Sequence, residues 1–137
     1  MMAAARRTAF LVMPLAVLAA CSQQAAPAAS ISNAPIVVKA SDTDCKLSRT
    51  EADAGTITFE VANEGTKATE FYLYAEDNRI VGEVEDISPG VTRRLVVEVA
   101  KGGRYTTACK PGMQGEGIRG DFVVRGGSST GSTTTPR

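Results

Sequence analysis

The stretch that decides the fold is residues 103–124, which read GRYTTACKPGMQGEGIRGDFVV. The first part is typical of a strand and ends at Cys109. A loop rich in proline and glycine follows and carries Met113, and the final DFVV begins a closing strand. The pattern predicts two β-strands joined by a loop that holds a cysteine at one end and a methionine within it.

The residues before this stretch are organised as further short strands. Residues 56–62 (TITFEVA) alternate, so that Phe59 lies on an apolar face, and residues 70–75 (EFYLYA) alternate Phe71 with Tyr72. Convincing helical periodicity is absent, although residues 48–54 are compatible with a single helical turn. About seven to eight short strands separated by turn residues predict an all-β fold, an antiparallel Greek-key β-sandwich.

The composition excludes several classes of function. The 137 residues include 15 basic and 15 acidic side chains and no histidine. The absence of histidine excludes Ser-His-Asp and Cys-His catalysis and any imidazole metal ligand. Zero net charge is a poor match for nucleic acid, which attracts a clustered basic face. Because Cys109 also has no evident activating base, we expect a protein that is not an enzyme.

The N-terminus has the features of an export signal. A basic pair, Arg6 and Arg7, precedes the apolar run TAFLVMPLAVLAA at residues 8–20. This run is too short to cross a membrane as a helix, which requires about 20 residues. The run ends in Leu-Ala-Ala-Cys, which resembles the bacterial lipobox. That resemblance implies cleavage before Cys21, lipidation of Cys21, and anchoring on the extracytoplasmic face of a bacterial membrane, in the periplasm or at the cell surface. The alternative is an ordinary secretory signal with a chance cysteine.

Composition divides the remaining chain into three parts. Residues 21–35 are small, polar and proline-punctuated, which predicts a flexible tether. Residues 36–125 contain the predicted strands and form the expected domain. Residues 126–137 (GGSSTGSTTTPR) lack apolar side chains, which predicts a disordered tail.

Apart from the predicted lipidation site Cys21, the mature chain has two cysteines, Cys45 and Cys109. An even pair in an exported protein is typical of a disulfide. The strand-end cysteine with a following methionine also resembles the cupredoxin metal loop, and soft sulfur donors suit Cu(I). Because the chain has no histidine, a His₂Cys blue-copper site is excluded. The loop itself suggests Met113 and Glu116 as additional ligands.

Residues 36–125 further resemble the N-terminal cupredoxin-like domain of EfeO, the exported component of an iron-uptake system. The matching features are Asp44-Cys45, Gly55, ATEF at residues 68–71, ISPG at residues 87–90, and the Cys109 loop. The resemblance implies a cupredoxin-like fold, copper or iron bound by Cys45, Cys109 and Glu70, and partners among iron-uptake permease or peroxidase components. EfeO continues into a large helical domain, whereas this sequence continues into the predicted tail, so we do not expect complete EfeO.

The sequence leaves two interpretations open. Cys45 and Cys109 are metal ligands, a disulfide, or a pair that binds metal when reduced and closes when oxidised. The function is accordingly that of a lipid-anchored metal protein or that of a non-catalytic, disulfide-stapled β-sandwich for adhesion or partner binding.

Overall fold

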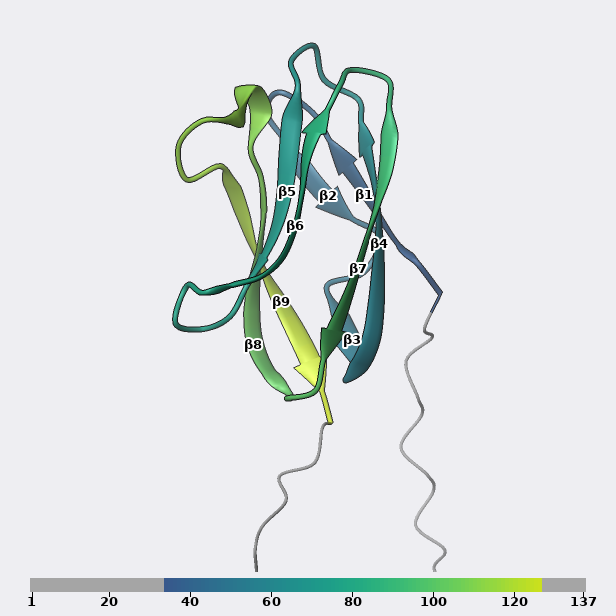
Figure 1. Cartoon of the computed structure of the whole chain (residues 1–137), viewed down its shortest axis with the longest axis vertical. Coiled ribbons are helices and arrows are strands. Elements are labelled where there is room, and N and C mark those ends of the chain that lie inside the picture. Colours follow the sequence, from purple (N-terminus) through teal and green to yellow (C-terminus); the bar gives the residue numbers. More distant parts are fainter. Residues whose placement is uncertain (1–33, 127–137) are drawn as a thin grey trace, which may run out of the picture.

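Two β-sheets face each other in the computed structural model, which describes residues 34–126 (Figure 1). The first sheet has the order β2-β1-β4-β7, with β2 (Cys45–Leu47), β1 (Ile36–Ala40), β4 (Gly55–Asn63) and β7 (Thr92–Val99). The second has the order β3-β9-β8-β5-β6, with β3 (Glu51–Asp53), β9 (Ile118–Arg125), β8 (Gly103–Cys109), β5 (Thr69–Tyr74) and β6 (Ile80–Ile87). A short 3₁₀ turn, η1 (Pro111–Met113), follows β8.

This arrangement confirms the predicted all-β sandwich and adds detail that the sequence did not provide. The described residues form nine strands rather than the predicted seven to eight, because the short segments β2 and β3 each pair at a sheet edge. Most neighbouring strands are antiparallel, but β1 pairs with β4 in parallel and β3 pairs with β9 in parallel. The two sheets are thus mixed, since the chain crosses from the first sheet to the second through β2 and β3.

The prediction that residues 48–54 could form a helical turn is wrong. Residues Glu51–Asp53 form strand β3, beside the last strand of the second sheet. Ala52 is buried there, and backbone hydrogen bonds on either side join Val123 to Thr50 and Ala54 to Arg125. Pairing with β9 satisfies these backbone groups, which an isolated helical turn would leave to solvent.

Three phenylalanine rings fill the centre of the sandwich. Phe59 of β4 lies 5.1 Å from Phe71 of β5 and 5.5 Å from Phe122 of β9, measured between ring centroids, and all three side chains are fully buried. The alternation predicted for β4 and β5 is confirmed here, because Ile57 and Leu73 are buried on the same inward faces. The rings therefore connect the two sheets across the core.

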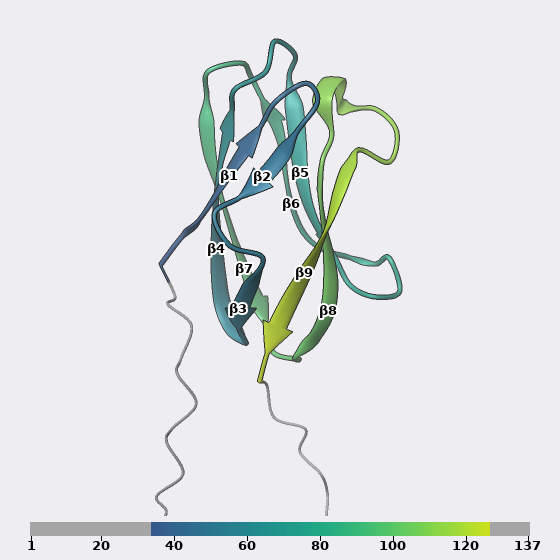
Figure 2. The same cartoon turned by 180° about the vertical axis from the view of Figure 1, so that it is seen from behind.

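One end of the sandwich gathers the segments that concern function. The β1–β2 turn, the β4–β5 connection and the β8–β9 loop all lie at this end, at the top of Figures 1 and 2. Buried Asn63, the last residue of β4, holds it together: its Nδ2 donates hydrogen bonds to the carbonyl oxygens of Lys67 (2.8 Å) and Ile87 (2.7 Å). The side chain thus links both sheets at the end where the loops meet.

The predicted signal peptide at 1–20 and the lipidation site Cys21 lie outside the described residues, as do most of the tether at 21–35 and of the tail at 126–137. Within residues 34–126, the structure contains no helix with the length and apolar character needed to cross a membrane.

Replacing Phe59 with alanine should destabilise the domain by about 3–5 kcal/mol, because it removes a fully buried ring and its two aromatic contacts. Denaturant unfolding followed by circular dichroism measures the change. Val96→Ala is the control on an exposed strand position, where 56% of the residue is accessible, and should change the unfolding free energy by less than about 0.5 kcal/mol. Equal effects of the two substitutions would contradict this description of the core.

Candidate functional site

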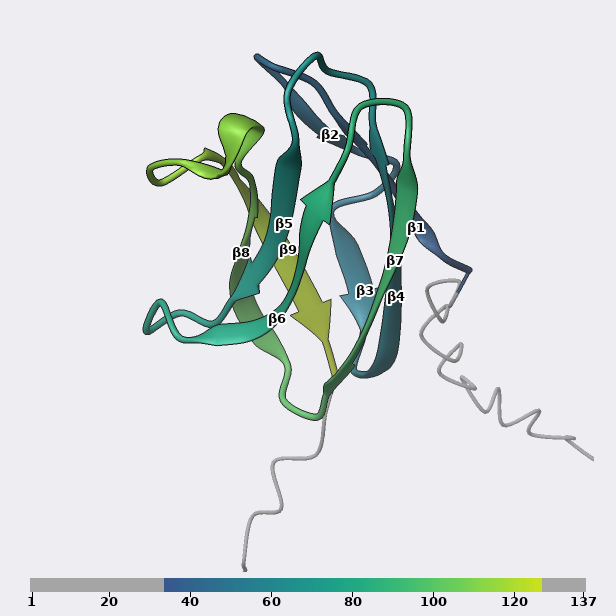
Figure 3. The same ribbon diagram turned by 45° about the horizontal axis from the view of Figure 1, so that its top comes forward.

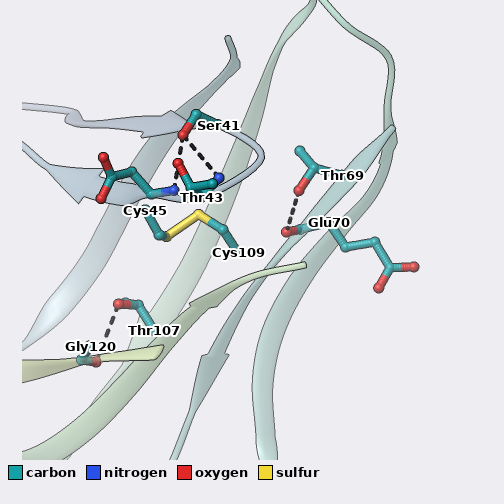
Figure 4. Close-up of a disulfide and its surroundings, with 9 residues drawn as sticks. Ser41, Thr43, Cys45, Thr69, Glu70, Thr107, Cys109 and Gly120 are labelled. Atoms are coloured by element: carbon teal, nitrogen blue, oxygen red, sulfur yellow. Dashed lines mark hydrogen bonds between the residues drawn. A yellow bond between two sulfur atoms is a disulfide. The ribbon is translucent and has the colours of Figure 1, made fainter. Parts of the chain in front are cut away.

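A tight turn between β1 and β2 places Cys45. The Ser41 Oγ accepts hydrogen bonds from the backbone N–H groups of Thr43 (3.3 Å) and Asp44 (2.9 Å), shown in Figure 4. The Ser41 N–H in turn donates to the Asp44 carbonyl at 2.8 Å. These bonds close the turn and set Cys45 opposite Ala40, the last residue of β1.

Cys109 reaches the same place from the second sheet. It is the last residue of β8, between Phe71 of β5 and Ile118 of β9, and it is fully buried. Because side chains alternate along a strand, Cys109 points into the sandwich while its neighbour Ala108 lies in a separate cluster with the outer tyrosines. The cysteine sulfur thus lies between the two sheets.

Cys45 and Cys109 form a disulfide in this structure (Figure 4). Their Cα atoms are 5.6 Å apart, inside the range of roughly 4.4–6.8 Å that a bridge requires. The bond joins β2, at the edge of the first sheet, to β8, at the centre of the second. Because the cysteines are 64 positions apart in the sequence, loop closure in the unfolded chain predicts a stabilisation of about 4 kcal/mol.

The loop after Cys109 is fastened to the start of β5. The Lys110 N–H donates to the Glu70 carbonyl at 2.9 Å, and the Gly112 N–H donates to the Ala68 carbonyl at 2.7 Å. Gly117 has φ +75°, and a Cβ there would lie 2.5 Å from the Cys109 carbonyl oxygen, so only glycine fits. Met113 lies in this loop with 42% of its surface exposed.

Glu70, proposed as a ligand from the sequence, faces away from the two cysteines. Figure 4 shows its carboxylate directed away from the disulfide. The Tyr72 hydroxyl lies 2.9 Å from Glu70 Oε2 and 3.2 Å from Glu85 Oε1, on the outer face of the second sheet. Burial of the ring, with the hydrogen bonds and negative charge of the two carboxylates, raises the pKa of Tyr72 well above its usual range.

Glu116 is also separate from the cysteine pair. Its side chain is 89% exposed, and Oε2 accepts an ion-paired hydrogen bond from Arg119 at 3.1 Å. Across residues 34–126, no three or more Cys, Asp or Glu side chains are grouped in a way that could hold a metal ion. The structure therefore brings together Cys45 and Cys109, with the Met113 loop following Cys109, and leaves Glu70 and Glu116 in contacts of their own.

A cluster on the outer face of the second sheet was not identified as a site from the sequence. The rings of Tyr72 and Tyr74 stack with centroids 5.4 Å apart, the Lys110 Nζ lies 4.2 Å above Tyr72, and the Arg119 guanidinium lies 4.8 Å above Tyr74. The alternation of residues 70–75 already placed the two tyrosines on one face. Their cationic neighbours, Lys110 directly after β8 and Arg119 in β9, are brought there by strand pairing.

Residues 11–124 match the sequence profile described as "Cupredoxin-like domain". The chain belongs to the cupredoxin-like domain family.

Among solved structures, it is similar to reduced auracyanin from Roseiflexus castenholzii, with 16% identity, a TM-score of 0.55, and coverage of 67% of this chain and 97% of auracyanin. It is also similar to an azurin from Methylomonas sp. strain J, with 13% identity, a TM-score of 0.51, and coverage of 67% and 98%. At this identity, the two structures establish the shared fold. A comparison with curated proteins gave no match.

Whether copper fits this cupredoxin-like site depends on the state of the two sulfurs. In the disulfide, neither sulfur is a thiolate, so the bridged form does not offer the ligands that Cu(I) prefers. Reduction would give two cysteine thiols on β2 and β8, whose Cα atoms lie 5.6 Å apart in the bridged form. The donor set therefore suits a soft metal ion in the reduced form alone.

The raised pKa of Tyr72 predicts a loss of stability at alkaline pH. Folding favours the protonated phenol, so its contribution is complete below the ordinary pKa of 10.0 and is lost as the pH rises above that value. The unfolding free energy of wild type should therefore fall more steeply above about pH 10 than that of Tyr72→Phe, measured by denaturant titrations at several pH values. Tyr74→Phe is the matched control, because it leaves the contact of Tyr72 with Glu70 and Glu85 intact. Parallel curves for wild type and Tyr72→Phe would disprove the assignment.

Proposed function

We propose that this protein is a non-catalytic cupredoxin-like metal protein that binds one Cu(I) ion when its disulfide is reduced. The observation that carries the proposal is the position of Cys45 and Cys109, which two different sheets bring to the same end of the sandwich. Met113 follows on the loop next to Cys109 and offers a thioether as an additional soft donor.

The chemistry of the pair supports Cu(I) in particular. A thiol reductant would supply two electrons and two protons to open the bridge, and the resulting thiols would lose their protons on binding the ion. The reduced site would hold a soft copper ion or pass it on to a partner. The strands hold Cys109 in the core, so the chain itself limits the access of water and of competing hard ligands.

Anchoring and a link to iron uptake complete the proposal. The Leu-Ala-Ala-Cys sequence at the end of the apolar run supports lipidation of Cys21 and a position on the extracytoplasmic face of a bacterial membrane.

The resemblance to EfeO supports an association with an iron-uptake permease or peroxidase. A pair of thiolates suits Cu(I), and the two carboxylates that could have added harder ligands for iron, Glu70 and Glu116, contact Tyr72 and Arg119 instead. Metal analysis of protein purified from its native membrane distinguishes the two metals.

A second candidate function follows from the closed disulfide. In that state the domain is a stapled β-sandwich without free thiols in its described part, which suits a non-catalytic adhesion or partner-binding module. Copper binding by the reduced protein separates this candidate from the first.

Cu(I) competition titrations on reduced protein test the proposed site. Wild type should bind one ion, and Cys45→Ser and Cys109→Ser should each weaken binding by at least about tenfold, because each substitution removes one of two thiolates. Met113→Leu keeps the side-chain volume and should cause a smaller loss. Affinity should fall as the pH drops, since both thiols must be deprotonated.

The comparison is matched for loss of the disulfide, because reduced wild type and both serine variants all lack it. Circular dichroism under the titration conditions should show the same β-sheet signal in each. Equal affinity in wild type and in both serine variants would refute the site and leave the stapled module as the preferred function.

Lipidation is tested by mass spectrometry of protein from bacterial membranes. Wild type should carry acyl groups on an N-terminal Cys21, and Cys21→Ser should carry none and lose its membrane association. Soluble, unacylated wild-type protein would show that the apolar run is an ordinary secretory signal.

A further inference from the structure

A hollow on the outer face of the second sheet is independent of the cysteine pair. It is lined by Tyr74, Asn78, Lys110, Glu116 and Arg119. Asn78 belongs to the loop between β5 and β6, and Glu116 belongs to the loop between β8 and β9. Figures 1 and 3 show these two loops projecting on the same side, away from the first sheet. The hollow thus opens to solvent, whereas the disulfide lies between the sheets.

Two stacked tyrosines form a rigid base for two positive charges. Tyr72 and Tyr74 are 6% and 8% exposed, and their rings are nearly parallel, at 9°. They hold Lys110 and Arg119 through the faces of the rings, which attract cations without neutralising them. In the described part of the chain, the Lys110 ammonium has no carboxylate within ion-pair distance, so its charge remains available.

Arg119 is fixed in direction. Its Nη2 donates to Asn78 Oδ1 at 2.9 Å, its Nη1 donates to Glu116 Oε2 at 3.1 Å, and its side chain is only 30% exposed. A guanidinium held in this way is prepared to receive a carboxylate, because little side-chain freedom is lost on binding.

Glu116 already places a carboxylate on this guanidinium. The residue is 89% exposed and lies between Gly115 and Gly117, both with positive φ. An exposed ion pair of this kind contributes little to stability, so an external anion can replace it at small cost. Glu116 therefore indicates that the hollow accepts a carboxylate.

We propose that this hollow binds a small organic anion with two or more carboxylates. One carboxylate replaces that of Glu116 on Arg119, and a second pairs with the ammonium of Lys110. Glu70 and Glu85 sit at the hydroxyl end of Tyr72 and repel anions there, so the ligand lies toward Tyr74 and Asn78. The site needs no change at the disulfide and does not depend on the proposed metal binding.

Citrate is the probe, added to the oxidised protein at constant ionic strength and followed by amide and arginine side-chain NMR shifts. Shifts should concentrate at residues 74, 78, 110, 116 and 119, and glycerol at the same concentration should produce none. Lys110→Gln should weaken citrate binding by about fivefold or more, because it removes one of two charges. Glu116→Gln should tighten binding by about two- to fivefold, because it removes the internal competitor.

Glu83→Gln is the matched control for net charge. Glu83 lies opposite Tyr72 on β6, is exposed, and loses the same single negative charge. Tighter binding in Glu116→Gln than in Glu83→Gln supports displacement at Arg119. Equal tightening in both variants would mean a general charge effect and would overturn the proposal, as would the absence of localised shifts with citrate.

Discussion

The bond between Cys45 and Cys109 is the constraint on which this end of the molecule depends. It joins a three-residue edge strand of one sheet to the central strand of the other, and it does so within the apolar core. A strand as short as β2 has few ladder hydrogen bonds of its own, so the covalent link and the Ser41 turn hold it in register. With Cys109 fixed, the following loop begins at a defined place and can dock on β5.

The alternation of side chains around Cys109 separates two kinds of chemistry. Cys109 faces the core, while Ala108 before it and Lys110 after it belong to the outer face. The sulfur of Cys109 therefore lies between the sheets, whereas the cation of the proposed anion site lies on the surface, although the two residues are consecutive. Substitutions can thus separate the two, since Lys110→Gln leaves the sulfurs unchanged and Cys45→Ser leaves the tyrosine base unchanged.

The sequence predicted those parts of the fold that follow from local patterns. Period-two alternation identified the buried faces of β4 and β5, including Phe59 and Phe71, and the position of Cys109 at a strand end followed from the loop after it. Strand β3 was missed because residues 48–54 show no alternating pattern. The two parallel pairings were missed because they depend on partner strands elsewhere in the chain. The same alternation in β5 already set Glu70 on the outer face, beside Tyr72 and opposite Phe71. The contact of Tyr72 with Glu85 and the ion pair of Glu116 with Arg119 could not be predicted, since they form only after the strands pair.

The proposed Cu(I) site also accounts for how the domain could tolerate loss of its disulfide. Opening the bridge restores the freedom of a 64-residue loop to the unfolded chain, which removes about 4 kcal/mol of stability. A ligand that binds only the folded form, at about 1,000 times its dissociation constant, stabilises that form by about 4.1 kcal/mol. An ion held by both thiolates would therefore restore most of what reduction removes, and it would do so between the same two strands. Disulfide and metal would then be alternative links between the sheets, chosen by the redox state of the compartment.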